Sequence, residues 1–187
     1  MGRAEELFQS IKSQGLPFIK QLIEDEISEE LYLDYKRSAD RGGNKHLHRT
    51  DRNNFCKAIS GFSNTEGGLI IWGVECGRNK IDDKDVPTEI YDIHNIKRFR
   101  SWMDSIVSGL TIPINAGVEN FDIITEGDSG LLISYIPKLE GEPLRALSNE
   151  KYFMRSGATF VSIPHNMLSK MFGFAPAPQL THNYLIE

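Results

Sequence analysis

The stretch Phe62-Ser63-Asn64-Thr65-Glu66-Gly67-Gly68-Leu69-Ile70-Ile71-Trp72-Gly73-Val74-Glu75 decides the fold of this chain. It follows a segment, 51–63, in which apolar residues recur at helical spacing. Thr50 or Asp51 can cap the first N–H groups of this helix. Gly67 and Gly68 tolerate positive φ and indicate that the helix ends before them. Leu69 to Val74 is apolar throughout, which is typical of a strand buried on both faces. The stretch therefore predicts a helix, a glycine turn and a core strand that ends at an acid.

A second informative stretch lies upstream, at Glu29-Glu30-Leu31-Tyr32-Leu33-Asp34-Tyr35-Lys36-Arg37-Ser38. Its alternating apolar residues predict a half-buried strand over 31–36. Asp34 and Lys36 project from the same face of that strand, because side chains repeat every two residues. An acid with a lysine two residues on is an arrangement that nucleases use, although a surface ion pair would give the same pattern. Glu29 can join Asp34 only if the chain bends near Leu31.

The rest of the chain alternates between helical and strand patterns. Pro17 favours the start of a second N-terminal helix, and the polar residues 77–91 predict a loop. Further helices are predicted over 4–14, 17–26, 92–110 and 165–172, and further strands over 118–125, 130–136 and 152–162. We expect an α/β (α+β) fold: a single domain with a mixed, about five-stranded sheet flanked by helices. The expected divisions are N-terminal helices at 1–28, a domain at 29–172 and a tail or linker at 173–187.

Composition restricts the classes of protein to which the chain can belong. It has 187 residues with a formal net charge of −5, which argues against coating nucleic acid with its whole surface. Its two cysteines lack the spacing of a zinc site. Because no GxxxxGK[ST] phosphate-binding motif occurs, we expect no nucleotide cofactor. No apolar run approaches the length of a membrane span, and the N-terminus lacks a secretory signal. We expect a soluble, cytoplasmic protein with no membrane partner.

Charge is distributed unevenly along the chain. Five acids and no base lie within 24–30. The segment that follows, from Lys36 to Arg52, is a basic run with six Lys or Arg residues. A charge run by itself is usually a solvated loop, but Gly42 and Gly43 inside this one would let it close over an anionic ligand. Arg155, next to Ser156-Gly157, is a further candidate for a phosphate contact. The basic residues expected to bind nucleic acid are Lys36, Arg37, Arg41, Lys45, Arg49, Arg52 and Arg155.

Three blocks of sequence together resemble the Schlafen AlbA-like domain family. They are Leu33-Asp34-Tyr35-Lys36-Arg37-Ser38, the helix–turn–strand block from Ile59 to Glu75, and Lys151-Tyr152-Phe153-Met154-Arg155-Ser156-Gly157-Ala158-Thr159. They occur in the family's order and span about residues 29–172. The resemblance implies a nucleic-acid-binding domain. It also implies a relationship to the vertebrate Schlafen nucleases, which are metal-dependent endoribonucleases that cut tRNA and rRNA.

The same resemblance implies a set of catalytic residues. The acidic trio of those nucleases corresponds here to Glu29, Asp34 and Glu75, which would hold Mg²⁺ or Mn²⁺ while Lys36 steadies the phosphate. Asp34 stands where the family usually has Glu, and Glu75 where the nucleases have Asp. The nuclease core has two such lobes and this chain contains one. A cradle for an RNA duplex therefore requires a homodimer or an added domain.

Three hypotheses follow from the sequence. The first is a nucleic-acid-binding module, for RNA or DNA, that grips the phosphate backbone through its basic loop. The second is the Mg²⁺- or Mn²⁺-dependent endoribonuclease with the acidic trio as its metal site. The third is a protein-interaction or regulatory domain that uses the acidic segment 24–30.

Overall fold

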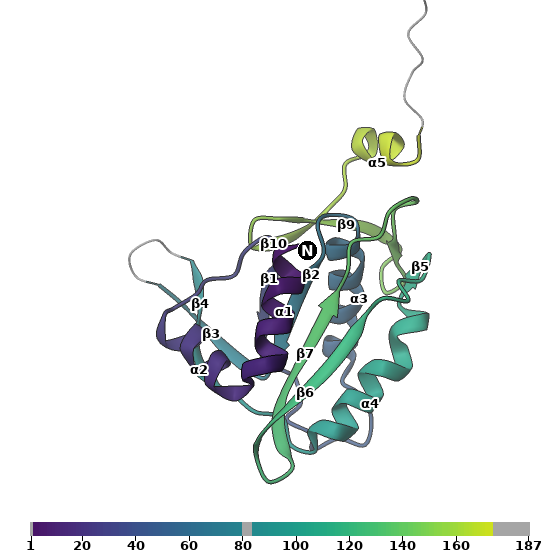
Figure 1. Ribbon diagram of the computed structural model, residues 1–187. Coiled ribbons are helices and arrows are strands. Elements are labelled where there is room, and N and C mark those ends of the chain that lie inside the picture. The colour runs from purple at the N-terminus through teal and green to yellow at the C-terminus, as the bar shows by residue number, and fades with distance from the viewer. Residues whose placement is uncertain (1, 80–83, 174–187) are drawn as a thin grey trace, which may run out of the picture.

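A four-stranded sheet with the strand order β1-β2-β7-β6 lies at the centre of the protein (Figure 1). The computed structural model describes residues 2–79 and 84–173. Strand β1 runs parallel to β2, whereas the β2–β7 and β7–β6 pairs are antiparallel. The predicted mixed sheet is thus confirmed. Its strands are β1 (Leu33–Lys36), β2 (Gly68–Trp72), β6 (Glu119–Glu126) and β7 (Ser129–Ile136).

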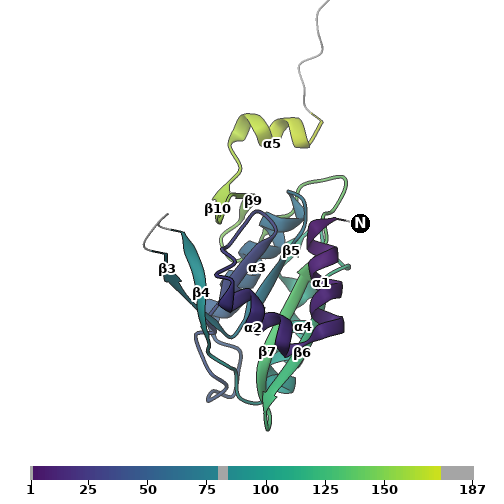
Figure 2. The same ribbon diagram turned by 60° about the vertical axis from the view of Figure 1, so that its left-hand side comes forward.

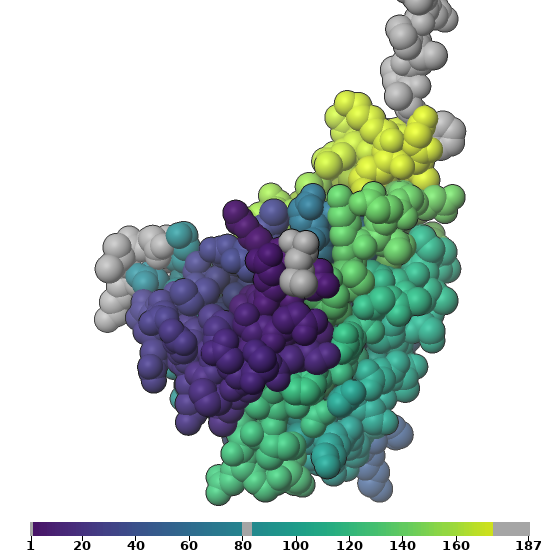
Figure 3. Space-filling model, viewed as in Figure 1, coloured from purple at the N-terminus to yellow at the C-terminus, as the bar shows by residue number. Residues whose placement is uncertain are grey.

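Helices cover both faces of this sheet (Figures 1 and 2). Along β2, Leu69 and Ile71 pack into the core under α1 and α2, while Ile70 and Trp72 pack into the core under α3 and α4. All four side chains are fully buried, which explains the uninterrupted apolar run in the sequence. Figure 3 shows α1 and α2 side by side on one surface of the molecule. The helices are α1 (Arg3–Gln14), α2 (Leu16–Glu24), α3 (Arg49–Ser63) and α4 (Ile96–Ile106).

The remaining strands form two smaller sheets. One has the order β10-β9-β8-β5 and packs against α3, and the other is the hairpin β3–β4. The α+β class is confirmed, although the strands are shared among three sheets instead of one five-stranded sheet. A 3₁₀ turn, η1 (Val107–Gly109), follows α4. The other elements are β3 (Val74–Arg78), β4 (Asp85–Ile90), β5 (Thr111–Ile112), β8 (Arg145–Ala146), β9 (Lys151–Ser156), β10 (Thr159–Ser162) and α5 (His165–Met171).

Two local expectations were wrong. The predicted loop 77–91 contains strand β4, whose signal is obscured by Pro87 and by its polar, exposed residues. The start of α3 was expected to be capped by Thr50 or Asp51, but His48 caps it, and its Nδ1 accepts a hydrogen bond from the Thr50 N–H. Asp51 is instead buried, and it accepts hydrogen bonds from the Ala39 N–H and the Ser38 hydroxyl.

Two findings apply only to the residues that the structure describes. The tail expected at 173–187 lies outside the described residues except for Gly173. Across residues 2–79 and 84–173, no helix has both the length and the apolar character needed to cross a membrane.

The glycine turn between α3 and β2 is sterically determined. Gly67 has φ of 79°, in the left-handed region, and a Cβ there would lie 3.0 Å from the Ile136 carbonyl oxygen. Gly68 has ordinary φ, but a Cβ at this position would overlap the Phe62 ring. The two glycines are therefore needed for different reasons, backbone conformation at Gly67 and space at Gly68.

We predict that Gly68→Ala lowers the free energy of unfolding by about 1–3 kcal/mol, because the added methyl group overpacks a closed core. Urea denaturation measures the change. Gly109→Ala is the matched control, because a Cβ at Gly109 meets no atom within 4 Å. A Gly68→Ala protein as stable as this control would contradict the steric argument.

Candidate functional site

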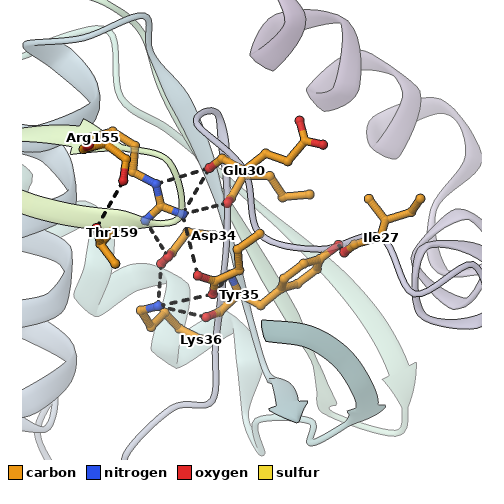
Figure 4. A network of polar contacts seen from close by, with 10 residues as sticks. Ile27, Glu30, Asp34, Tyr35, Lys36, Arg155 and Thr159 are labelled. Carbon is orange, nitrogen blue, oxygen red and sulfur yellow. Dashed lines mark hydrogen bonds and ion pairs between the residues drawn. The ribbon is translucent and has the colours of Figure 1, made fainter. Parts of the chain in front are cut away.

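A buried ion pair joins Asp34 of β1 to Arg155 of β9 (Figure 4). The Arg155 Nη1 donates to the Asp34 Oδ1 over 2.9 Å, and both side chains are almost completely buried. The other guanidinium nitrogens donate to the backbone oxygens of Glu30 and Leu33. The guanidinium also lies 4.5 Å from the Phe160 ring centroid. Because burial of an unpaired charge is costly, these contacts together fix β9 against the start of β1.

The glycine-turn block positions this arginine. The Thr65 hydroxyl accepts a hydrogen bond from the Arg155 N–H over 2.9 Å. The amide nitrogen of Asn64 donates to the Leu144 and Phe153 oxygens, and its oxygen accepts from the Leu144 N–H. Asn64 therefore anchors both β8 and β9 to the end of α3. The three blocks of sequence are thus parts of one hydrogen-bonded unit.

The chain bends before β1, as Glu29 requires if it is to reach Asp34. Glu30 and Leu33 exchange backbone hydrogen bonds across a tight turn. The Glu29 carboxylate, which is 8% exposed, accepts a hydrogen bond from the Tyr35 N–H over 3.1 Å. Its oxygens lie 3.7 Å from the Lys36 Nζ and 3.6 Å from the Arg155 Nη2. The structure therefore brings together four predicted site residues, Glu29, Asp34, Lys36 and Arg155.

Lys36 lies between the two carboxylates. Its Nζ is 2.7 Å from the Asp34 Oδ2, and that oxygen has no hydrogen-bond partner. The same Nζ donates a hydrogen bond to the Tyr35 backbone oxygen. Burial alone would lower the pKa of Lys36, but Asp34 and Glu29 raise it overall. Lys36 is consequently a fixed positive charge inside the cluster.

Burial changes the titration of two other groups here. It raises the pKa of Glu29 to about 7, with the Asp34 charge as a further cause, and Lys36 and Arg155 only partly oppose the shift. Burial, followed by the charge of Glu29, raises the pKa of the Cys76 thiol to about 12. The thiol therefore stays protonated at neutral pH and is a poor nucleophile.

These side chains line a cavity of about 510 Å³. Eight of its twelve lining residues were not predicted as site residues, among them Asn54, Lys57, Cys76, Asp85 and Thr159. Asn54 and Lys57 lie three residues apart on α3, so helical spacing could have paired them. Asp85 could not have been found, because β4 was taken for a loop. Three acids (Glu29, Asp34 and Asp85) face three bases (Lys36, Lys57 and Arg155) around the cavity, so their charges balance once Glu29 is ionised.

Glu75 does not join this cluster. It is not among the residues that line the cavity, where its neighbour Cys76 takes its place. The carboxylate of Glu75 instead accepts a hydrogen bond from the Arg37 Nη1 over 2.8 Å. The register of β3 against β4 shifts between Glu75 and Cys76, and of these two residues only Cys76 lines the cavity. The structure thus does not assemble the expected acidic trio.

The residues as placed do not fit a divalent cation. Mg²⁺ and Mn²⁺ require several oxygen ligands, but only Glu29 and Asp34 converge, and both already face Lys36 and Arg155. Within the described part of the chain, no group of three or more His, Cys, Asp or Glu residues could hold a metal ion. We therefore derive no chemical step that depends on a metal.

The basic residues predicted to bind nucleic acid lie in three different environments. Arg155 is buried in the ion pair with Asp34, which leaves it no surface for a phosphate, and Lys36 is paired with the same carboxylate. Arg37 and Arg41 both stack on Tyr91, at 3.9 and 4.1 Å from its ring centroid, and each is paired with a carboxylate. These two arginines are half-exposed but already neutralised.

Lys45, Arg49 and Arg52 form the third group. All three are exposed, in the loop before α3 and in its first turn. Among the described residues, none of the three has a carboxylate within 4.0 Å. The N–H groups at the start of α3 add positive potential at the same place. The free positive charge of the predicted loop is therefore concentrated at the N-terminus of α3.

A family model described as "Schlafen, AlbA_2" matches residues 29–163, which include the bend, the glycine turn and the Arg155 strand. The chain belongs to the Schlafen AlbA_2 family. No curated protein matches the chain. The residues that carried the resemblance to this family are the same residues that hold β1, the glycine turn and β9 together.

The solved structures that resemble this Schlafen AlbA_2 chain include the following two. One is the N-terminal domain of a DNA helicase RecG-related protein from Nitrosomonas europaea, at 14% identity and a TM-score of 0.52, with 88% of this chain and 97% of that chain covered. The other is the DIP2311 protein from Corynebacterium diphtheriae, at 13% identity and a TM-score of 0.47. The match covers 88% of this chain but only 28% of that protein. At such low identity, the first likeness supports the fold alone.

We predict that Arg155→Met lowers the free energy of unfolding by about 3–5 kcal/mol, because it breaks a buried ion pair and leaves Lys36 as the remaining cation beside the Asp34 carboxylate. Chemical denaturation at pH 7 measures the loss. The double variant Asp34→Asn/Arg155→Met removes both charges and should be more stable than Arg155→Met alone. If the double variant loses at least as much free energy of unfolding as Asp34→Asn and Arg155→Met lose together, charge pairing has no role.

We also predict a pH-dependent effect of Glu29→Gln. Because the pKa of Glu29 is raised from 4.5 to about 7 on folding, its contribution to stability is full below pH 4.5 and is lost as the pH rises through 7. Relative to the wild-type protein, the Gln variant should gain about 3 kcal/mol between pH 4.5 and pH 8. Denaturation curves across this range measure the gain. A constant stability difference would mean that Glu29 titrates normally.

Proposed function

We propose that this protein binds nucleic acid through the positive surface at the N-terminus of α3. One observation carries the proposal: Lys45, Arg49 and Arg52 are exposed and have no carboxylate partners among the described residues. Cations without internal partners can exchange their counterions for phosphate oxygens. Membership of the Schlafen AlbA_2 family supports the same class of ligand.

The distribution of charge explains how an acidic protein can bind nucleic acid. The net charge of −5 gives no general attraction for phosphate, so binding depends on a local concentration of positive charge. The Glu29 cavity does not supply it, because its three bases face three acids. The Tyr91 stack contributes weakly, because Arg37 and Arg41 already have carboxylate partners. Of the predicted contacts, those at the N-terminus of α3 are left as the principal ones.

A metal-dependent endoribonuclease is the alternative for the same fold. The placement of Glu75 beside Arg37 and of Lys36 between the two acids does not favour it. Incubation of the protein with structured RNA, including tRNA, and Mn²⁺ tests this alternative. Cleavage that is abolished by Asp34→Ala would replace binding with catalysis as the principal function.

We predict that affinity for an oligonucleotide falls steeply with salt, and that Arg52→Ala lowers the slope of log K against log[salt] by about 1. The loss should be similar for different sequences, because phosphate contacts do not read bases. Fluorescence anisotropy between 50 and 200 mM NaCl measures both quantities. Parallel measurements with RNA and DNA oligonucleotides establish which of the two nucleic acids the protein prefers.

Lys20→Ala is the charge-matched control, because Lys20 is exposed on α2, on the opposite face of the central sheet. The control should leave the salt slope unchanged. Equal effects of Lys20→Ala and Arg52→Ala would show that only net charge matters. Failure of RNA and DNA alike to bind would contradict the proposal and favour a protein-interaction domain. Sedimentation of the same samples measures whether the complex contains a homodimer.

A further inference from the structure

A second cavity, of about 320 Å³, opens beside the proposed phosphate contacts. It lies between the first turns of α3, the segment from η1 to β5, and the turn after β8. It shares no lining residue with the Glu29 cavity. Its volume is at the lower end of the range for small-molecule sites, about 300–1,000 Å³, so it suits a ligand larger than a bare phosphate.

The inner part of this cavity is apolar. Leu110 and Cys56 are buried there, and Leu147 is half-buried. The Cys56 thiol donates to the Leu110 oxygen over 3.0 Å and accepts from the Ser148 N–H over 3.4 Å. Because its polar atom is already bonded, Cys56 contributes an apolar surface that is held in place. Such a surface favours a flat or apolar group over a hydrated ion.

The rim of the cavity is cationic and polar. Arg49, Arg52 and Asn53 line it, and they share one face of α3 with Cys56 because residues three and four apart are neighbours on a helix. Asn53 is exposed, and its amide offers both a donor and an acceptor. The two guanidinium groups have no carboxylate partner among the described residues. They can bind phosphate or stack on a planar ring.

We propose that this cavity binds the base of an unstacked nucleotide while Arg49 and Arg52 hold the adjoining phosphates. The inference rests on the proposed nucleic-acid binding and assigns it a specific subsite. An apolar floor, an amide at the rim and flanking arginines are the features by which proteins hold bases splayed out of a strand. A single strand is the preferred form, because its bases need not be unpaired before they enter.

The arrangement of α3 also gives the strand a path. Asn53 faces the base cavity, whereas the next residue, Asn54, lines the Glu29 cavity together with Lys57. The two cavities thus open on neighbouring faces of one helix. A strand that crosses the start of α3 places one base in the second cavity and directs its backbone toward Lys57.

The test compares two oligomers that carry the same number of phosphates, a twelve-unit oligothymidylate and a twelve-unit abasic oligomer. We expect the wild-type protein to bind the thymidylate about tenfold more tightly, because only it can fill the cavity. Gly109→Leu should remove this preference by occupying the cavity. Gly109 lines the cavity, its φ lies outside the left-handed region, and an added Cβ meets no atom within 4 Å, so the variant should fold.

Ser108→Leu is the matched control, because it adds the same side chain one residue away and does not line the cavity. It should keep the tenfold preference, whereas Arg52→Ala should weaken the binding of both oligomers. Denaturation curves verify that each variant is folded. Equal binding of the two oligomers by the wild-type protein, or an unchanged preference in Gly109→Leu, overturns the base subsite but leaves the phosphate contacts. Absence of binding to both oligomers, and to the RNA oligonucleotide of the salt titration as well, overturns the subsite and the proposed function together.

Discussion

The buried ion pair between Asp34 and Arg155 is the interaction on which the rest of the site depends. A carboxylate that is 1% exposed can remain charged only with a cation beside it, and Arg155 reaches it from a strand more than a hundred residues away in sequence. The same guanidinium binds the backbone at Glu30 and Leu33, which stabilises the bend that carries Glu29 inward. One pair therefore closes the chain around the cavity and sets the positions of its other charges.

This role changes how the basic and acidic residues of the chain are interpreted. Four of them, Glu29, Asp34, Lys36 and Arg155, neutralise one another in the interior and stabilise the fold. Arg37 and Arg41 are held on Tyr91 by their own carboxylate partners. Of the residues predicted to bind nucleic acid, those at the start of α3 remain available to a ligand, because no carboxylate among the described residues pairs with them. The separation of structural from available charges is the physical basis for preferring binding over metal-dependent cleavage.

The sequence was most informative where local and tertiary requirements agree. The apolar run through β2, the glycines after α3 and the spacing of Asp34 and Lys36 each have one favourable structural outcome, and each was predicted. Hairpin β3–β4 was missed because Pro87 and its polar residues carry no strand signal. Glu75 was expected in the cluster and lies beside Arg37, because the side of β3 that faces the cavity is set by its pairing with β4.

By itself, the sequence determined the family, the fold class and the need for a bend before β1, since these follow from periodicity, glycine positions and three ordered blocks. Only the tertiary structure decided which charges are available. A lysine or arginine looks the same in sequence whether it is solvated or paired, and the difference depends on which carboxylates the fold brings near it. Arg155 and Arg52 illustrate this: both are arginines in predicted binding segments, but Asp34 neutralises one and nothing in the described structure neutralises the other.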